Sequence, residues 1–485
     1  MPAANPAHLD LQATAREVML KNGFQPDFPE SVAAQLASLS RQQSANGNVR
    51  DLRSLLWSSI DNDTSRDLDQ IEVTERLSNG DIKIMIGIAD VDAFVPRQTP
   101  IDRHAARETT TVYTGIRNFP MLPEQLSTGL TSLLENQDRP SVIIEFVADA
   151  AGNLKSSDVY RALVRNKAQL QYNSVGAWLE GTAAAPPKVA SSDELQQQLK
   201  VQDEVAQNLK QQRIQNGALN LQTDETHPLV LNERVVDIVK QPKNRATELI
   251  EDFMVTANGV VARMLENVSS LRRIVRTPKR WDRIAQLAGA VGDHLPAEPD
   301  SKALNNFLLR RKDADPSRFA DLSLAVIKLM GPREYVLERA GEVAPGHFGL
   351  AVQDYTHSTA PNRRFADVVT QRLLKAMLAG QRNPYSDDEL TVIASNCTQK
   401  EDAARKVERE MSKRLAAVAM EHRVGEVFDA IVTGVTDHGT FIRVLKPHVE
   451  GLLAEGQHGL DVGDRLRARL VRTDVAKGYV DFARA

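Results

Sequence analysis

The chain has 485 residues, of which 42% are hydrophobic and 26% are charged, and its formal net charge is −4 at pH 7. A chain of this length exceeds one ordinary hydrophobic core, so we expect a large central domain with smaller appendages. The composition excludes a disordered or membrane protein, because no run of about 18 apolar residues is available to span a bilayer. The slightly acidic balance also excludes a uniformly basic nucleic-acid binder, although it leaves room for a local basic channel.

The single cysteine, Cys397, excludes an intramolecular disulfide and a cysteine-rich metal site. One lone thiol is typical of proteins from a reducing compartment. The N-terminal sequence Met-Pro-Ala-Ala-Asn-Pro lacks the basic and apolar regions of a secretory signal. The sequence therefore predicts a cytoplasmic protein with no membrane partner, and we expect it to be a monomer.

Residues 1–50 predict a small helical module. Apolar residues recur at helical spacing over residues 11–21 and 30–41, and a Gly-Phe-Gln-Pro-Asp-Phe-Pro turn separates the two stretches. The pattern is compatible with a helix-turn-helix-like unit, and equally with a plain helical lead-in to the next domain.

Residues 51–421 predict one large α+β domain. Strand and helix patterns alternate too irregularly for a doubly wound parallel sheet, and the sequence contains no internal repeat. The Ala-Ala-Ala-Pro-Pro and Ser-Ser sequences within residues 180–200 predict a surface loop or an insertion rather than a domain boundary. The β-rich runs lie at residues 82–88, 142–147 and 159–164, and the helical patterns lie at 248–266, 368–379 and 393–421.

The tail, residues 424–485, predicts a separate all-β unit. Five short strand candidates are punctuated by glycines, a pattern typical of OB-type barrels that bind oligonucleotides. The order of its motifs, Val-Gly-Glu-Val-Phe, Asp-His-Gly-Thr-Phe-Ile, Glu-Gly-Leu-Leu and Val-Gly-Asp-Arg-Leu, resembles the S1 RNA-binding domain. The strand candidates are residues 427–435, 440–445, 450–453, 465–472 and 479–483.

A dense aspartate cluster precedes a predicted β-hairpin at residues 71–88. Four aspartates fall within nine positions, namely Asp61, Asp63, Asp67 and Asp69. Carboxylates this close repel one another and are costly to bury unless a cation compensates. Mg²⁺ would suit the cluster, because it usually binds through one or two carboxylates together with waters and substrate phosphate. From spacing alone, a solvated acidic loop fits the pattern equally well.

This aspartate run resembles the motif of the RNase II family, in which an aspartate, five residues, an aspartate, one residue and two further aspartates follow in order. Asp61, Asp67 and Asp69 match the first three positions, and the fourth position is Gln70. The resemblance implies that these four residues hold Mg²⁺, or Mn²⁺ in its place, and that Asp69 is catalytic. A glutamine offers an oxygen but no charge, so Glu72, on the same strand face as Gln70, is a candidate substitute.

Five further blocks of the sequence are similar to RNase II family blocks and follow in order. The resemblance implies a processive, Mg²⁺-dependent 3′-to-5′ exoribonuclease that hydrolyses single-stranded RNA to nucleoside 5′-monophosphates. One alternative, suggested by Gln70, is a catalytically weak RNA-binding protein of the same fold, and another is a nuclease that acts on DNA. The blocks are residues 87–92, 118–127, 248–258, 347–350 and 355–367.

Two adjacent arginines, Arg363 and Arg364, follow Pro361 and open a predicted helix. By resemblance, Arg363 is catalytic: it clamps the scissile phosphate and stabilises charge on the departing oxygen, for which a guanidinium is well suited. The alternative for Arg363 is a structural ion pair. Arg364 joins the candidate RNA-binding residues, although an ion pair with Asp367 is the favoured interpretation.

Four other residues of the large domain are candidates for contact with RNA. Tyr113 and Tyr172 fall where the family places aromatics along the RNA path, and stacking on a tyrosine accepts every base. Core packing is the alternative for both. The resemblance implies that Glu251 lies near a ribose 2′-hydroxyl, the group that separates RNA from DNA, and that Glu408 contacts the bound strand. For Glu408, pairing with a basic neighbour on a charged helix is the alternative.

Two other sets of residues are candidates for nucleic-acid contact. In the tail, His438, Phe441 and Arg443 lie on or beside one predicted strand, an arrangement that resembles the aromatic and basic RNA-binding surface of S1 domains. The basic run at residues 271–280 is either part of a nucleic-acid surface or, by default, solvated charge.

Overall fold

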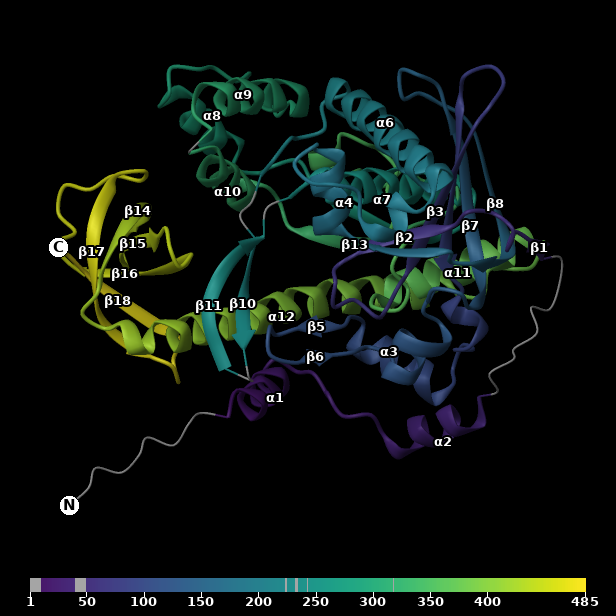
Figure 1. Ribbon diagram of the computed structural model, residues 1–485, viewed down its shortest axis with the longest axis horizontal. Coiled ribbons are helices and arrows are strands. Elements are labelled where there is room, and N and C mark those ends of the chain that lie inside the picture. The colour runs from purple at the N-terminus through teal and green to yellow at the C-terminus, as the bar shows by residue number, and fades with distance from the viewer. Residues whose placement is uncertain (1–9, 40–48, 223–224, 232–233, 242, 317) are drawn as a thin grey trace.

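The computed structural model describes residues 10–39, 49–222, 225–231, 234–241, 243–316 and 318–485. A mixed body of helices and strands lies at one end and a β-barrel at the other, and the long helix α12 (Asp387–Met420) runs between them (Figure 1). A capping box between Ser386 and Glu389 fixes the start of this helix. Its 34 residues rise about 50 Å, which is enough to join the two parts of the molecule.

Seven strands form the central sheet of the body: β1 (Arg50–Asp51), β2 (Ser58–Asp61), β3 (Gln70–Arg76), β4 (Ile82–Ala89), β7 (Asp138–Ala148), β8 (Leu154–Arg165) and β9 (Ala168–Gln171). Their order is β1-β8-β7-β4-β3-β2-β9. The edge strand β1 is parallel to its neighbour β8, and the edge strand β9 is parallel to its neighbour β2; all other neighbouring strands are antiparallel. The apolar side chains of β4 are almost all buried, because strands flank it and helices pack on the sheet. The predicted hairpin at residues 71–88 is confirmed as β3 and β4.

The helices of the body surround this sheet, and α12 joins them: α3 (Pro100–Glu108), α4 (Tyr172–Leu179), α5 (Pro187–Ala190), α6 (Asp193–Gln215), α7 (Arg245–Met264) and α11 (Phe365–Leu378). The predicted surface loop is confirmed at residues 181–186, which are irregular and mostly exposed, and it is wrong from residue 187, where α5 and then α6 begin. Ser192, at the end of the Ser-Ser sequence, is the N-cap of α6, and its hydroxyl accepts a hydrogen bond from the Leu195 N–H. Throughout the described ranges, no helix has both the length and the apolar character needed to cross a bilayer.

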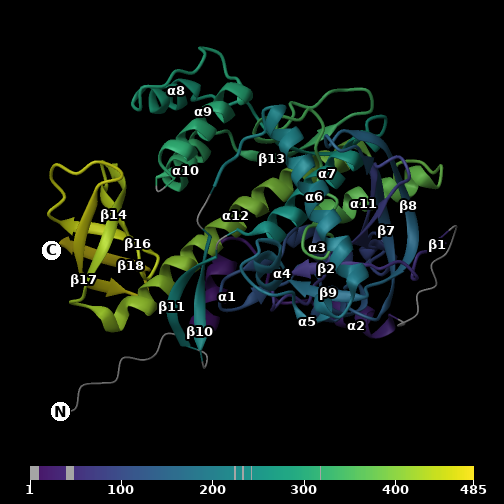
Figure 2. The ribbon, with the colours of Figure 1, turned by 45° about the horizontal axis from the view of Figure 1, so that its top comes forward.

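A helical lobe and three small sheets complete the body. The lobe has its own core around Trp281, Phe307 and Phe319, and it lies on the same side of α12 as the barrel in both views (Figures 1 and 2). Its helices are α8 (Trp281–Gly289), α9 (Ser301–Ala314) and α10 (Phe319–Leu329). The small sheets pair β5 (Val112–Tyr113) with β6 (Asn118–Phe119), β10 (Glu225–Leu231) with β11 (Arg234–Gln241), and β12 (Ser270–Val275) with β13 (Arg333–Glu338).

The C-terminal strands close into a five-stranded barrel, in the order β14-β15-β16-β18-β17. Apolar side chains alternate inward along each strand and meet in one core with the end of α12. The predicted fold class, a mixed α+β domain followed by an OB-type barrel, is confirmed. The barrel strands are β14 (Val427–Thr436), β15 (Gly439–Val444), β16 (Val449–Glu455), β17 (Arg465–Asp474) and β18 (Tyr479–Arg484).

The N-terminal helices do not form a helix-turn-helix unit. Helix α1 (Leu11–Lys21) packs on α12, whereas α2 (Glu30–Ser38) packs on α3. Residues 40 and 41, where the sequence extended the second helix, lie outside the described residues. Because the two helices rest on different partners, the alternative of a helical lead-in describes the N-terminus better.

The basic run at residues 271–280 is not solvated charge over its first half, so the default interpretation is wrong there. Arg272 and Arg273 lie in β12 and are buried, with 1% and 4% of their surfaces exposed. The Arg272 guanidinium donates from Nε to Glu338 Oε1 (2.6 Å), and Arg273 donates from Nη2 to Glu401 Oε1 (2.7 Å). These buried arginines fix β12 against β13 and α12, which the sequence pattern of a basic run does not indicate.

A Glu338→Ala variant is therefore expected to lower the free energy of unfolding by about 3–5 kcal/mol, because the buried Arg272 charge loses its partner. Thermal or urea unfolding of the purified protein measures the loss. Glu334→Ala is the matched control on the same strand. Glu334 Oε2 lies 3.3 Å from Nε of Arg276, whose side chain is 45% exposed, so the free energy of unfolding should fall by less than about 1 kcal/mol. Equal losses in the two variants would contradict the importance of the buried pair.

Candidate active site

The first carboxylates of the site lie on adjacent strands of the central sheet. Asp61 ends β2, and Gln70 and Glu72 lie on one face of β3, which pairs with β2. The Gln70 amide donates from Nε2 to Asp61 Oδ1 (3.3 Å). Asp61 Oδ2 and both Glu72 carboxylate oxygens are buried and have no hydrogen-bond partner among the described residues. Burial raises the pKa of Asp61 to about 7 and raises the pKa of Glu72 well above its ordinary value.

A Glu72→Gln variant is expected to be more heat-stable than the parent protein in metal-free buffer. Glu72 is fully buried beside Asp61, and a neutral amide removes the cost of placing a second carboxylate there. Relief of about 1 kcal/mol corresponds to a rise of roughly 1–2 °C in Tm for a domain of this size, which scanning fluorimetry in EDTA resolves. Glu75→Gln, at an exposed position of the same strand, is the control: it loses only a surface ion pair with Lys83, worth less than about 1 kcal/mol, so Tm should change little. A lower Tm for Glu72→Gln would contradict this account.

Asp69 joins the aspartate loop to a segment almost 300 positions further along the chain. The backbone N–H of Asn362 donates to Asp69 Oδ1 (2.9 Å), and Arg363 Nε lies 3.5 Å from Asp69 Oδ2. Asp69 is 3% exposed, and burial raises its pKa to about 7 despite the nearby guanidinium. The Arg363 side chain is 49% exposed, so it reaches from the carboxylate into an accessible space.

Tyr113 connects the aspartate loop to the long helix. Its hydroxyl donates to Asp67 Oδ2 (3.4 Å), and its backbone N–H donates to Glu408 Oε1 (3.2 Å). Burial raises the pKa of the phenol above its ordinary value, so the hydroxyl stays protonated and able to donate. The residue is nevertheless 39% exposed, which leaves part of its ring available for contact.

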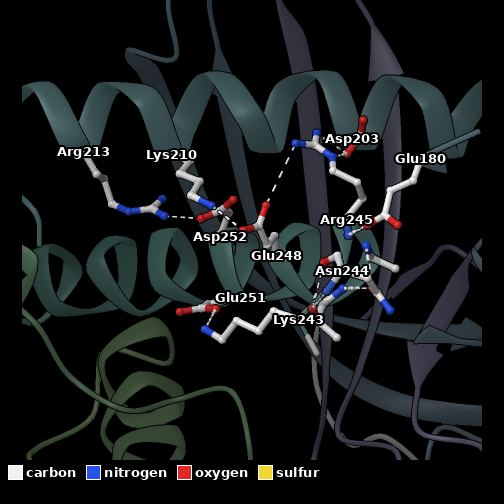
Figure 3. A network of polar contacts seen from close by, with 12 residues as sticks. Glu180, Asp203, Lys210, Arg213, Lys243, Asn244, Arg245, Glu248, Glu251 and Asp252 are labelled. Atoms are coloured by element: carbon white, nitrogen blue, oxygen red, sulfur yellow. Dashed lines mark hydrogen bonds and ion pairs between the residues drawn. The ribbon is translucent and has the colours of Figure 1, made fainter. Parts of the chain in front are cut away.

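Tyr172 lies between the aspartate cluster and Glu251. It begins α4, and its pKa is raised chiefly by burial and further by the negative charges of Asp61, Glu72 and Glu251. Glu251 in turn forms an ion pair with Lys243 (2.6 Å), as Figure 3 shows. The structure therefore brings both predicted aromatics, Tyr113 and Tyr172, to the surroundings of the aspartates.

A cavity of about 340 Å³ adjoins Glu251 between α6 and α7. Two ion pairs cross from one helix to the other at its edge: Lys210 to Glu248 (2.7 Å), and Arg213 to Asp252 (Figure 3). The pairs hold the helices together and leave a wall with more basic than acidic groups. The charged residues that line the cavity are Lys210, Arg213, Lys240, Lys243, Glu248, Glu251, Asp252 and Lys312.

A second, larger recess of about 550 Å³ lies where α12, α10, the β10–β11 hairpin and the barrel meet. Glu408, which binds the Tyr113 backbone, lines it together with Arg443 of β15. Arg443 does not project freely, because its Nη2 lies 3.0 Å from Asp321 Oδ1 of α10. The other charged residues and histidine of the lining are Arg405, Arg409, Lys413, His448 and Glu450.

The remaining candidate residues lie away from the aspartates or serve as structural partners. Arg364 donates from Nε and Nη2 to Asp367 (2.9 and 2.7 Å), which confirms the predicted ion pair. On the barrel, His438 is exposed in the turn before β15, and Phe441 shares the outward face of that strand with Arg443. His438 and part of Phe441 are therefore accessible on the barrel, whereas Arg364 and Arg443 are both held in ion pairs.

The oxygen-rich cluster suits a hard divalent cation. Asp61 and Glu72 supply buried carboxylate oxygens without partners, and such groups are stabilised by a cation. Over the described residues, no three Asp, Glu, His or Cys side chains converge as a ready-made metal cage. This arrangement fits Mg²⁺, which typically takes one or two protein carboxylates and completes its shell with water and phosphate, better than it fits zinc.

Sequence reasoning missed two groups of the site. Asn362 fixes Asp69 through its backbone, and its side-chain Oδ1 accepts a hydrogen bond from the Thr131 hydroxyl (2.6 Å). Its place in the Pro-Asn-Arg-Arg sequence was the only signal for this role. Asp321, the partner of Arg443, gave no signal because it comes from a helix of the separate lobe.

The chain is similar to known proteins over nearly all of its length. Residues 49–380 match the RNB domain, and residues 426–485 match the RNase II-type exonuclease C-terminal S1 domain. Ribonuclease R of Thermotoga maritima is 29% identical over 495 residues, which cover 94% of this chain and 68% of that protein. Across ribonuclease R relatives, the chain spans between 53% and 74% of the relative's length.

Solved structures show the same fold. Mycoplasma genitalium RNase R in complex with double-stranded RNA is 25% identical, with a TM-score of 0.87 over 98% of this chain and 83% of that one. Yeast Ssd1, a pseudonuclease, is 17% identical and has a TM-score of 0.71 over 96% of this chain and 59% of that one. The RNB match covers well over half of the chain, so the protein belongs to the RNB family and carries an RNase II-type exonuclease C-terminal S1 domain.

Proposed function

We propose that this protein is a cytoplasmic, processive, Mg²⁺-dependent 3′-to-5′ exoribonuclease that hydrolyses single-stranded RNA to nucleoside 5′-monophosphates. Residues 51–421 would form its catalytic part, residues 424–485 its RNA-binding barrel, and residues 1–50 an N-terminal module. The observation that carries the proposal is the meeting of Asp69 with Asn362 and Arg363. Two distant segments converge there on one buried carboxylate, beside an exposed guanidinium.

The metal site would be formed by Asp61, Asp67 and Asp69 with the Gln70 side-chain oxygen, and Glu72 is placed to add a carboxylate. When bound, Mg²⁺ would activate water and offset charge on the departing 3′-oxygen. The hydrogen bond from the Gln70 amide to Asp61 orients that carboxylate, and the Asn362 N–H orients Asp69. These contacts hold the carboxylates in place, so little reorganisation is needed during the reaction.

Arg363 would contact the scissile phosphate. Its half-exposed guanidinium can turn toward a substrate oxygen while Asp69 anchors its Nε side. Planar guanidinium groups bind phosphate through two parallel hydrogen bonds, which also resist misalignment of the reacting bond. In this position the arginine stabilises the negative charge that develops as the bond between phosphorus and the 3′-oxygen breaks.

The RNA strand would pass from the barrel to the aspartates. The basic recess between the barrel and α12 ends at Glu408, which binds the Tyr113 backbone, and Tyr113 in turn reaches Asp67. Tyr113 would stack on the terminal base, and Tyr172 and Glu251 would contact the adjoining nucleotides. Stacking and phosphate contacts accept any base, which suits processive degradation.

Digestion of a single-stranded RNA labelled at its 5′ end, with MgCl₂ or with EDTA, tests the proposal. The expected result in MgCl₂ is shortening of the labelled strand from its 3′ end, with the unlabelled 5′-monophosphates identified by chromatography, and no degradation in EDTA. RNA binding without degradation in both buffers would overturn the catalytic proposal. The matching DNA oligonucleotide is the control, and equal degradation of DNA and RNA would favour a nuclease of broader specificity.

A catalytically weak RNA-binding protein is the second candidate, and Gln70 favours it. The family motif has an aspartate at this position, and yeast Ssd1 illustrates that the fold also occurs in a pseudonuclease. A Gln70→Asp variant separates the candidates under the same conditions. Strong degradation by the variant, with none by the parent protein, would support the second candidate.

A further inference from the structure

We propose that the N-terminal segment, residues 10–38, is an intramolecular support that sets the position of Tyr113. In this way the segment would affect how tightly the protein binds the 3′ end of the RNA. The role at the RNA end rests on the proposed function. The structural part rests on the contacts between α1, the β5–β6 hairpin and α12. Tyr113 contacts substrate in the proposal, so the N-terminal residues are positioning residues rather than catalytic ones.

The β5–β6 hairpin is too small to hold its own shape. Each strand has only two residues, and the hairpin carries Tyr113 at the end of β5. Short isolated hairpins are marginal in water, so this one depends on what it packs against. Its apolar residues Val112 and Phe119 are 0% and 3% exposed, although neither belongs to the main core of the body.

The cover for these residues comes from α1 and α12 together. Val112 and Phe119 share a separate small core with one face of α1, the Phe24 ring and one face of α12. Figure 1 shows α1 beside the β5–β6 hairpin, and α1 also packs on α12. Removal of α1 would expose apolar surface on the hairpin. The members of this core from α1 and α12 are Ala15, Val18, Met19, Ala404, Val407 and Met411.

The same stretch of α12 holds Tyr113 directly. Glu408, which accepts the Tyr113 N–H, lies next to Val407 and three positions before Met411, so the small core and this hydrogen bond share one helical turn. Lys400, two turns earlier, donates to the Gly23 carbonyl (2.6 Å) and lies 4.4 Å from the Phe24 ring centre. A shift of the N-terminal segment is therefore transmitted to both sides of the hairpin.

A second set of contacts fixes the segment beyond Phe24. The Gln25 N–H donates to Glu108 Oε2 of α3 (2.9 Å), and the Phe28 and His104 rings lie 4.4 Å apart. The segment thus spans α12 and α3, with the hairpin between them.

The charge of the N-terminal segment argues against a phosphate-binding role. Residues 10–38 contain two basic residues (Arg16 and Lys21) and four acidic ones (Asp10, Glu17, Asp27 and Glu30).

Two adjacent residues of α1 offer a matched test. Met19 is 2% exposed in the small core, whereas Leu20 is 45% exposed. Met19→Ala is expected to weaken binding of a short fluorescent RNA about fivefold or more, because an unsupported Tyr113 loses part of its stacking. Leu20→Ala should bind as the parent does, and Met19→Leu should restore binding. Binding is measured by anisotropy in EDTA, where no hydrolysis is expected.

The kinetic readout separates positioning from general damage. With MgCl₂, Met19→Ala should raise KM for short RNA and lengthen the final product, while kcat on long RNA stays within about twofold of the parent. If Met19→Ala bound RNA and gave products of the same length as Leu20→Ala does, the proposal would be wrong. It would also be wrong if the kcat of Met19→Ala on long RNA fell as much as its binding of short RNA. If the parent protein were inactive, only the proposed function would be wrong. RNA binding in EDTA would still test whether residues 10–38 set the position of Tyr113.

A second variant covers the case in which Met19→Ala fails to fold. Lys400→Met removes the hydrogen bond to Gly23 and the cation above Phe24, but it keeps the aliphatic stem and leaves the apolar core intact. The same rise in KM and the same longer product are expected. If Lys400→Met binds and degrades short RNA as the parent does, the inference is wrong.

Discussion

An Asp69→Asn variant is expected to lose RNA hydrolysis by about three orders of magnitude or more while it still binds RNA. Asparagine keeps the shape of the side chain and can still accept the Asn362 N–H bond, but it removes the charge that would hold Mg²⁺ and anchor Arg363. Single-turnover hydrolysis of labelled RNA measures the loss of rate, and anisotropy with the same RNA measures binding.

Asp63→Asn is the matched control within the same loop. Asp63 is exposed, and it is the one aspartate of this cluster that falls outside the family motif. Its variant should keep the hydrolysis rate within about twofold of the parent protein. Substantial hydrolysis by a clean preparation of Asp69→Asn, or an equal loss in both variants, would contradict the proposed metal site.

The elements that local patterns specify could be predicted from the sequence. Alternating apolar residues and the Ser-Asn-Gly-Asp turn predicted the β3–β4 hairpin, and glycine-punctuated strands predicted the barrel. The barrel strands begin and end within two residues of the predicted bounds. Such features depend on residues close in sequence, so the pattern alone contains them.

Contacts between distant segments could not be predicted in the same way. A basic run gives no sign that Arg272 will be buried against Glu338, 66 positions away. The resemblance to S1 domains implied that Arg443 contacts RNA, but in the structure it pairs with Asp321, which belongs to another lobe. The resemblance implied a catalytic role for Asp69 and for Arg363, but neither it nor the spacing predicted that the two side chains lie 3.5 Å apart. These pairs depend on the tertiary arrangement, which no local period records.

The second large effect is expected from Arg363, and its neighbour Arg364 provides the contrast. Arg363→Ala should lower kcat about 10²- to 10³-fold with little change in Tm, because its side chain is half-exposed and its pairing with Asp69 is loose at 3.5 Å. Arg363→Lys should recover only part of the rate, since an ammonium cannot bind phosphate through two parallel hydrogen bonds.

Arg364→Ala should behave in the opposite way. Its two hydrogen bonds to Asp367, which is 0% exposed, secure the first turn of α11. Among the described residues, their loss leaves this buried carboxylate with only the Ala360 N–H as partner. The expected result is a loss of about 3–5 kcal/mol in stability, measured by urea unfolding, with per-molecule activity reduced far less than in Arg363→Ala. If both variants lost activity and stability to the same extent, the division of labour between these adjacent arginines would be wrong, and Arg363 would act as a structural partner of Asp69 rather than as the phosphate-binding group.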